Sequence, residues 1–411
     1  MNNSTINRNI LRLALPSIMA NITVPLVGIV DLAIAGRLGD AASIGGIAIG
    51  SMLFDLLYWN MGFLRVGTGG ITAQAFGRSD FKEAMDTFTR GIVTALAVAL
   101  LIWIIQWVYI EAAFALVVCS PEVESIAREY FFIRVWAAPA TLSLMVFKGW
   151  FIGMQNTVLP MAVDITVNVL NVVISYILAV HTPMGVAGVA AGTVVAQYGG
   201  LLLAIILMHS NFREYFHLIS VRASIKLNKM KRFFSINGNL FIRSLCMLVI
   251  YIGFTSIAAR YGDTLLAVSS VMMKLLLLYS YFVDGFAYAG EALVGRFIGE
   301  KDSDSLISTV RRIFIWCFGI SIASTLIYAG LGKPMFRLMT DNPAVVEAST
   351  PFLFWLLLMP VVSCIAFTWD GIFIGATATH HLRNSMIWSA ALFVVTYIVF
   401  EPLLGIQSLY L

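Results

Sequence analysis

Residues 13–36 read LALPSIMANITVPLVGIVDLAIAG, an apolar run with a single charged residue, Asp31. A helix of roughly 20 mainly apolar residues crosses the hydrocarbon core of a bilayer, so this run predicts a membrane span. Similar runs recur along the chain and predict eleven spans, at residues 10–36, 42–76, 91–111, 130–154, 158–180, 185–209, 234–260, 264–298, 312–332, 351–376 and 384–401. The sequence therefore predicts an all-α polytopic membrane protein.

The overall composition agrees with this class. Of the 411 residues, 60% are hydrophobic and only 12% are charged, whereas a soluble domain is about one quarter charged. The four cysteines form no CxxC pair, so neither zinc nor a disulfide framework is indicated. Walker, GxGxxG, HExxH and GxSxG motifs are missing from the sequence. We therefore expect no enzyme activity, no cofactor, no metal and no nucleic-acid partner.

The distribution of Lys and Arg predicts the orientation. With the N-terminus in the cytoplasm, the cytoplasmic segments hold about sixteen of these residues and the opposite side about five. The longest loop, residues 210–232, is basic. We interpret it as a linker between two helix bundles, residues 1–209 and 233–411. In the alternative interpretation, the loop lies on the anionic inner leaflet.

An internal repeat relates the two halves. At a shift of 222–223 residues, GRLGD (36–40) matches ARYGD (259–263), and KGWFIG (148–153) matches DGIFIG (370–375). Each repeat corresponds to six spans, so the repeats are parallel, which is a transporter architecture. The substrate path is expected between the halves, near the midplane. The chain ends where a twelfth span should begin, so we expect that helix to be missing from it.

Most ionisable residues inside the spans can be paired. A charge in the bilayer is costly unless it is paired or hydrated. Lys148 and Asp164 lie at the same depth on consecutive spans, which predicts a structural ion pair. Arg243 and Glu291 show the same arrangement and are interpreted in the same way. Arg134 lies near the outer end of its span, where a long side chain can snorkel.

Asp31 is different, because its own span offers no basic residue nearby. At similar depth, other spans of the same half carry Asn171, Ser175 and Thr193, of which the first two lie one helical turn apart. Burial among apolar groups disfavours the charged form of a carboxyl group, so Asp31 could bind and release a proton near neutral pH. The alternative is a structural carboxyl group capped by hydroxyls or by a lysine of another span.

Two prolines precede this carboxyl group in the same span. Pro16 and Pro25 remove backbone hydrogen bonds and permit a kink, so protonation could be coupled to bending. A second candidate for function is Asp284, near mid-membrane in the eighth span. Its alternative interpretation is an ion pair with Lys274 or Arg65.

Four segments resemble the multidrug and toxic compound extrusion (MATE) family, and within it the DinF-like branch. They are LALPSIMANITVPLVGIVDLAIAGRLGD (13–40), YWNMGFLRVGTGGITAQAFGRSD (58–80), GWFIGMQNT (149–157) and YFVDGFAYAGEALVGRFIGEKD (281–302). The likeness extends along the whole chain. It implies two six-helix bundles and export of organic cations and other amphipathic compounds by antiport with protons or sodium.

The resemblance also implies roles for individual residues. A coupling aspartate in the first span matches Asp31, and a proline thought to permit bending matches Pro16. A polar cluster on spans five and six corresponds here to Asn171, Ser175 and Thr193. Many relatives carry a second aspartate where this chain has Ser175, and sodium-coupled relatives use a glutamate in span seven, which this chain lacks. Both departures favour protons over sodium.

These patterns together predict a proton-coupled multidrug efflux transporter. We expect a monomer in the bacterial inner membrane, with its N-terminus in the cytoplasm, that exports amphipathic or cationic small molecules. A lipid or oligosaccharide flippase is the main alternative, but it would need a larger and more basic central cavity. A membrane-embedded enzyme would need clustered catalytic residues, whereas the five histidines lie in loops or at span ends.

Overall fold

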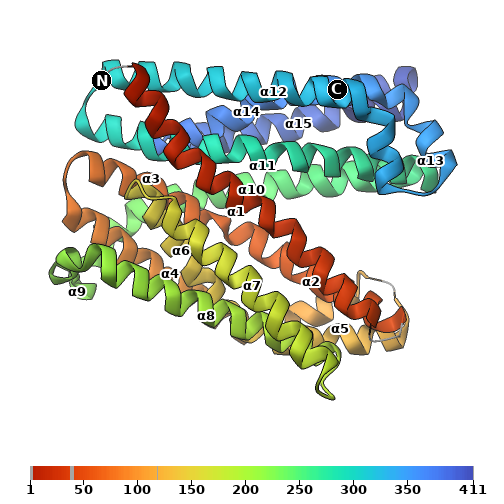
Figure 1. The fold of residues 1–411 in the computed structure, drawn as a ribbon, viewed down its shortest axis with the longest axis horizontal. Coiled ribbons are helices and arrows are strands. Elements are labelled where there is room, and N and C mark those ends of the chain that lie inside the picture. Colours follow the sequence, from red (N-terminus) through yellow and green to blue (C-terminus); the bar gives the residue numbers. More distant parts are fainter. Residues whose placement is uncertain (1–2, 38–40, 118, 411) are drawn as a thin grey trace. The chain divides into compact units, whose positions relative to one another are not determined.

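The computed structural model describes residues 3–37, 41–117 and 119–410, and every regular element among them is a helix (Figure 1). The longer helices are α1 (Asn3–Arg37), α2 (Ala41–Trp59), α3 (Phe63–Gly77), α4 (Phe81–Phe114), α5 (Pro121–Arg134), α6 (Ala138–Gly153), α7 (Val158–Val180), α8 (Val186–Phe212), α10 (Leu227–Arg260), α11 (Asp263–Glu300), α12 (Ser303–Met339), α14 (Leu353–Gly375) and α15 (Thr379–Leu404). The short elements are α9 (Val221–Ser224), α13 (Pro343–Ala348) and the 3-10 turns at Asn60–Gly62, Val135–Ala137, Arg213–Leu218, Thr350–Phe352 and Gly405–Tyr410.

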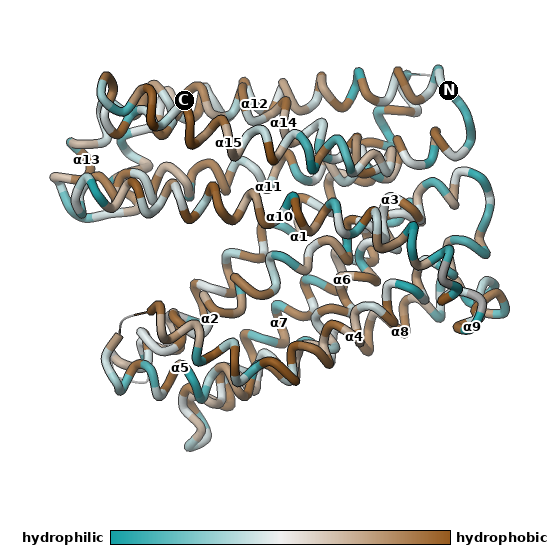
Figure 2. The backbone as a smooth tube through the Cα atoms, turned by 180° about the vertical axis from the view of Figure 1, so that it is seen from behind, coloured by the Kyte–Doolittle hydropathy of each residue, from teal (hydrophilic) through white to brown (hydrophobic). Residues whose placement is uncertain are grey.

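Eleven helical stretches among the described residues are long and apolar enough to cross a membrane, which confirms the eleven predicted spans. Figure 2 shows hydrophobic residues along the long helices and hydrophilic residues gathered toward loops, including the region of α9. The helices extend beyond several predicted spans. For example, α4 begins at Phe81 and α12 at Ser303, because Asp80 and Asp302 cap these helices by accepting the backbone N–H of Glu83 and Ser305 at 3.0 Å.

The helices form two compact units. The N-terminal unit comprises Met19–Asn237, and the C-terminal unit comprises the described residues before Met19 together with those from Gly238 on. We predicted bundles of residues 1–209 and 233–411, divided by the loop at 210–232. The compact units instead divide inside α1 and inside α10, so each of these helices contributes to both units.

In the N-terminal unit, α7 packs on α8, α3 on α6, and α2 on α5. The rings of Phe54 (α2) and Phe131 (α5) stack with centroids 4.8 Å apart. The fully buried Trp150 of α6 donates its indole N–H to the Ala84 carbonyl of α4 at 3.0 Å, so its one polar group is satisfied inside the core.

Within the N-terminal unit, a polar network joins Ser224 of α9 and the start of α10 to α4. Ser224 Oγ donates to Asp86 Oδ1 of α4 at 2.8 Å, and Lys229 Nζ forms an ion pair with Asp86 and lies 3.3 Å from Glu83 Oε2. Arg90 completes the network through a 2.6 Å contact with Glu83. Asp86 is fully buried, so its charge needs these partners.

In the C-terminal unit, α11 packs on α14 and α12. The buried Tyr279 hydroxyl of α11 donates to the Pro360 carbonyl of α14 at 2.8 Å. The start of α1 belongs to this unit. Asn3 Oδ1 accepts a hydrogen bond from Arg312 Nε at 3.2 Å, and Asn7 Oδ1 accepts one from the indole N–H of Trp316 at 3.4 Å.

The internal repeat is visible in the backbone. Outside glycine, positive φ angles occur among the described residues at Ser79 (56°), Gln155 (63°), Lys301 (59°) and Thr377 (53°). The first and third, and the second and fourth, are separated by the repeat shift of 222 residues. L-residues rarely adopt this conformation. Its occurrence at corresponding positions shows that two turns have the same backbone conformation in both halves.

Two close helix contacts repeat in the same way. A Cβ atom on Gly149 would lie 2.1 Å from the Arg65 carbonyl oxygen, and one on Gly371 would lie 2.2 Å from the Ala287 carbonyl oxygen. Both members of each contact are related by the 222-residue shift. The predicted repeat is therefore present in the packing, although residues 38–40 of the GRLGD match lie outside the described residues.

Candidate functional site

Asp31 lies on α1 in the N-terminal unit, where α1 contacts α7 on both sides of it. Asn168 Nδ2 of α7 donates to Thr23 Oγ1 at 2.7 Å, and Arg37 Nη1 donates to the Tyr176 hydroxyl of α7 at 3.3 Å. Both helices run in the same direction between these contacts, so Asp31 is level with the middle of this segment of α7.

The carboxyl group of Asp31 has an unusual environment for an acid. The residue is partly buried, and its Oδ1 atom is buried without a hydrogen-bond partner among the described residues. A buried acceptor without a donor costs free energy, so such an atom requires a proton, a water molecule or a ligand to satisfy it.

Asn171, Ser175 and Thr193 are brought together in one buried polar cluster between α7 and α8. Asn171 Nδ2 donates to Thr193 Oγ1 at 2.8 Å. The hydroxyls of Thr193 and Ser175 both donate to the Val189 carbonyl, at 3.1 and 3.2 Å. Asn171 Oδ1 remains buried without a donor among the described residues. The cluster therefore offers a second unsatisfied acceptor, on the part of α7 that lies level with Asp31.

A glycine permits this cluster to form. A Cβ atom on Gly192 of α8 would lie 2.4 Å from Ser175 Oγ and 2.6 Å from the Ser175 backbone. The absence of a side chain at this position lets α7 and α8 approach closely. The close approach explains how a serine hydroxyl on one helix reaches a backbone carbonyl on the other.

Arg134, which we expected to snorkel at the outer end of its span, belongs to the surroundings of Asp31. Its guanidinium instead turns toward α2: Nη1 donates to the Tyr130 hydroxyl at 2.9 Å and to Ser51 Oγ at 3.4 Å. The guanidinium carbon lies 4.9 Å from the ring centroid of Phe54, a cation–π distance.

Arg134 also interacts electrostatically with two acids, Asp31 and Asp55. The isolation of Asp31 predicted from its own span therefore does not hold, because the cation comes from α5. The spacing of polar residues in the sequence could have indicated this interaction. Ser51 and Asp55, like Tyr130 and Arg134, are spaced i, i+4, which places polar pairs on single faces of apolar helices.

Of the two predicted ion pairs, one forms as expected and the other has a different acidic partner. Lys148 of α6 and Asp164 of α7 form an ion pair. Arg243 of α10 pairs with Asp370 of α14 through a 2.8 Å contact, rather than with the predicted Glu291. Residue depth can be estimated from a span, but the choice between neighbouring helices depends on packing. Glu291 is fully buried in α11, where its backbone carbonyl contacts Gly375 of α14.

Three predicted candidates, Pro16, Pro25 and Asp284, are not members of this polar cluster. Pro16 and Pro25 lie within the continuous helix α1, and Pro16 is two residues from the boundary between the compact units. Asp284 is partly buried in α11 of the C-terminal unit. Among the described residues, no group of three His, Cys, Asp or Glu side chains could hold a metal ion.

Comparison with known proteins gives consistent matches. The MatE family matches the chain twice, at residues 16–177 and 240–403, which together exceed half of the chain. DNA damage-inducible protein F of Escherichia coli K12 is 32% identical over 97% of this chain and 87% of its own length. A probable multidrug resistance protein NorM of Neisseria meningitidis is 23% identical over 86% of this chain and 79% of its own.

Solved structures agree with the sequence matches. The Vibrio cholerae MATE transporter VcmN, crystallised in a bent form, superimposes with a TM-score of 0.87. The alignment covers 99% of this chain and 92% of that one at 15% identity, which shows a shared fold. The double family match and the fold establish that this chain belongs to the MatE family of membrane transporters, which are not enzymes.

Proposed function

We propose that this chain is a proton-coupled antiporter that exports amphipathic, cationic organic compounds from the cytoplasm. Asp31 carries the coupling proton, and Asn171, Ser175 and Thr193 form the polar part of the binding site. The observation that carries the proposal is the buried Asp31 Oδ1, which lacks a hydrogen-bond donor among the described residues. A proton or a cationic ligand would satisfy this atom, and one would exclude the other.

Arg134 sharpens this competition. When Asp31 is ionised, its negative charge is partly balanced by Arg134, and a cation can still approach the carboxylate. When Asp31 is protonated, its charge no longer offsets that of Arg134, so the site becomes more positive by one charge and binds a cationic ligand less well, because charges interact strongly in a medium of low dielectric constant. By linkage, proton binding and substrate binding therefore weaken each other.

The choice of protons over sodium rests on the available ligands. A hard cation is bound by several oxygen atoms, usually including carboxylates. The cluster provides one amide, Asn171, and two hydroxyls that already donate to a backbone carbonyl. Asn171 Oδ1 is free to accept a hydrogen bond from a substrate. These donors and acceptors suit an organic ligand with an N–H group better than a bare ion.

The charge asymmetry of the loops supports a cytoplasmic N-terminus. The similarity to a protein of Escherichia coli supports the inner membrane of a bacterium as its location. With this orientation, the basic segment 210–232 faces the cytoplasm, and export runs toward the end of the molecule where α12 meets α13.

Asp31→Asn tests the proposal, because asparagine keeps the shape and hydrogen-bonding capacity of the side chain but cannot ionise. Uptake of a fluorescent organic cation is measured in proteoliposomes with proton and sodium gradients imposed separately. We expect the proton gradient to drive uptake by the natural protein and Asp31→Asn to reduce it to the level of empty vesicles. Asp31→Glu should retain part of the activity, because it keeps an ionisable group.

Asp304→Asn is the matched control, because it makes the same chemical change at an exposed position in the first turn of α12. Its proton-driven uptake should equal that of the natural protein. Undiminished uptake by Asp31→Asn would refute the role of Asp31. Stimulation by sodium alone would refute proton coupling, even if Asp31 proved essential.

A further inference from the structure

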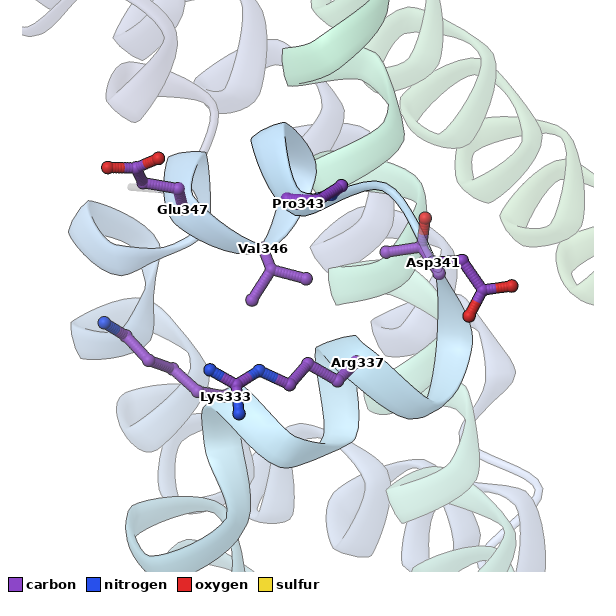
Figure 3. A pocket seen from close by; sticks show the side chains of 7 residues that line it. Lys333, Arg337, Asp341, Pro343, Val346 and Glu347 are labelled. Carbon is purple, nitrogen blue, oxygen red and sulfur yellow. The ribbon is translucent and has the colours of Figure 1, made fainter.

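A cavity of about 460 Å³ lies where α12 ends and α13 begins, within the C-terminal unit (Figure 3). Its size falls in the range of small-ligand pockets, about 300–1,000 Å³. Lys333 and Arg337 come from the last turns of α12, Val346 and Glu347 from α13, and Asp341 from the connection between them. Figure 3 shows Val346 pointing into the cavity above the two cationic side chains.

The four charged side chains of this cavity are not paired with one another. Lys333, Arg337, Asp341 and Glu347 are exposed, and among the described residues none of the four makes an ion pair. Cations in the last turns of a helix commonly snorkel to the membrane surface. Snorkelling alone does not explain why two acids line the same cavity and leave the cations unpaired. Figure 3 shows the Asp341 carboxylate directed away from the cavity, which leaves Glu347 as the acid that can face a ligand held by the two cations.

The face of α12 that leads to the cavity is apolar and uncovered. Ile322, Leu326, Gly330, Lys333 and Arg337 follow one another at intervals of three or four residues, so they share one helix face. Ile322 and Leu326 are 57% and 67% exposed within the structure. In a membrane-spanning helix, such a face contacts lipid chains. The cationic residues therefore stand at the end of a lipid-facing stripe.

We propose that this cavity binds the headgroup of a phospholipid, with ethanolamine preferred over glycerol. The phosphate lies between Lys333 and Arg337, which are one helical turn apart, and the ammonium group lies near Glu347. The acyl chains follow the exposed stripe through Leu326 and Ile322. In the orientation proposed above, this lipid belongs to the outer leaflet, but binding itself does not depend on the transport mechanism.

Native mass spectrometry of the purified full chain tests the proposal. Delipidated protein is titrated with dioleoyl phosphatidylethanolamine, with dioleoyl phosphatidylglycerol, or with inorganic phosphate. We expect the natural protein to retain phosphatidylethanolamine in preference to phosphatidylglycerol. Lys333→Gln combined with Arg337→Gln should weaken binding of both lipids about tenfold, because hydrogen bonds to a charged phosphate are lost. Glu347→Gln should remove the preference for ethanolamine but keep the binding of both lipids.

The matched control combines Lys301→Gln with Arg311→Gln, which removes two positive charges near the opposite end of α12. This variant should bind both lipids as the natural protein does. Equal loss in the control, or unchanged binding in the Lys333/Arg337 variant, would overturn the site. Displacement of the lipid by millimolar inorganic phosphate would overturn the lipid assignment in favour of a free anion. Lys333→Arg should retain binding, which separates loss of charge from misfolding.

Discussion

The two halves of this protein share backbone turns and helix contacts, but they differ in the side chains at corresponding positions. At the repeat shift of 222 residues, Arg134 corresponds to Leu356, and Tyr130 corresponds to Phe352. Leu356 and Phe352 are buried in an apolar core of the C-terminal unit, whereas Arg134 and Tyr130 form a hydrogen-bonded pair in the N-terminal unit. The two halves therefore have the same fold, but the polar pair of Arg134 and Tyr130 occurs only in the first half, because its counterparts are apolar.

Two residues that correspond in the repeat and form ion pairs inside the spans carry opposite charges. Lys148 and Asp370 correspond at the same shift, and each forms an ion pair within its own unit. Lys148 pairs with Asp164 of α7, whereas Asp370 pairs with Arg243 of α10. Each half neutralises its own charge with a partner from a different helix. We therefore interpret both ion pairs as structural, each stabilising its own unit.

The largest expected effect tests the shared backbone. Gly149→Ala and Gly371→Ala each place a Cβ atom about 2 Å from a backbone carbonyl oxygen, which cannot move aside as a side chain could. We expect each variant to lose about 1–3 kcal/mol of stability or more through overpacking. The measurement is thermal unfolding of the purified protein in detergent.

Gly319→Ala is the control for both glycine variants, because a Cβ atom there meets nothing within 4 Å. It should be neutral or slightly stabilising, since alanine restricts the unfolded chain. If either Gly149→Ala or Gly371→Ala behaved like this control, the two halves would not share the contact, and the structural part of the comparison would fail.

The second prediction tests the difference in chemistry. Arg134→Met removes the positive charge near Asp31, and the neutral form of the carboxyl group is then favoured over a wider pH range. We expect the pH at which proton-driven uptake is half-maximal to rise by about one unit. The measurement is uptake as a function of pH in proteoliposomes. Leu356→Met, the equivalent change in the other half, should leave this pH unchanged. Identical profiles for Arg134→Met and the natural protein would remove Arg134 from the site.

The smallest expected effect concerns the equivalent helix caps at Asp80 and Asp302. The hydrogen bond from the Ser305 hydroxyl, together with backbone N–H groups, lowers the pKa of Asp302 below its usual value. A lowered pKa in the folded state contributes stability above the unfolded pKa, and this contribution is lost as the pH falls. Asp302→Ala should therefore lower Tm slightly at neutral pH.

The difference in Tm between the natural protein and Asp302→Ala should shrink as the medium becomes acidic. Asp80→Ala should also lower Tm slightly at neutral pH, since Asp80 caps α4 with the same geometry. A difference that stayed constant into strongly acidic buffer would show that the carboxylate charge does not matter at this cap.

Much of the fold could be predicted because lipid imposes a simple rule on the sequence. Apolar runs marked all eleven spans, but they could not mark helix ends such as those at Phe81 and Ser303. The additional turns are polar and lie outside the apolar runs, so hydropathy does not detect them. Their start signals were the capping residues Asp80 and Asp302.

The site was predictable in part, for a related reason. Helical spacing placed Asn171 and Ser175 on one face, and the structure joins them with Thr193. The partners of Arg134 and Arg243 could not be derived in this way. Position along a span gives depth in the membrane, but it does not tell which helices are neighbours or which way a side chain turns.

The division of α1 and α10 between the compact units means that neither repeat is self-contained. The residues before Met19 are encoded with the first repeat but bond to α12, and Lys229 is encoded with the second repeat but bonds to Asp86 of α4. A chain cut between α9 and α10 would yield two fragments that have exchanged their leading turns, as in a domain-swapped dimer. Each repeat therefore needs the leading turns of the other repeat to complete its compact unit.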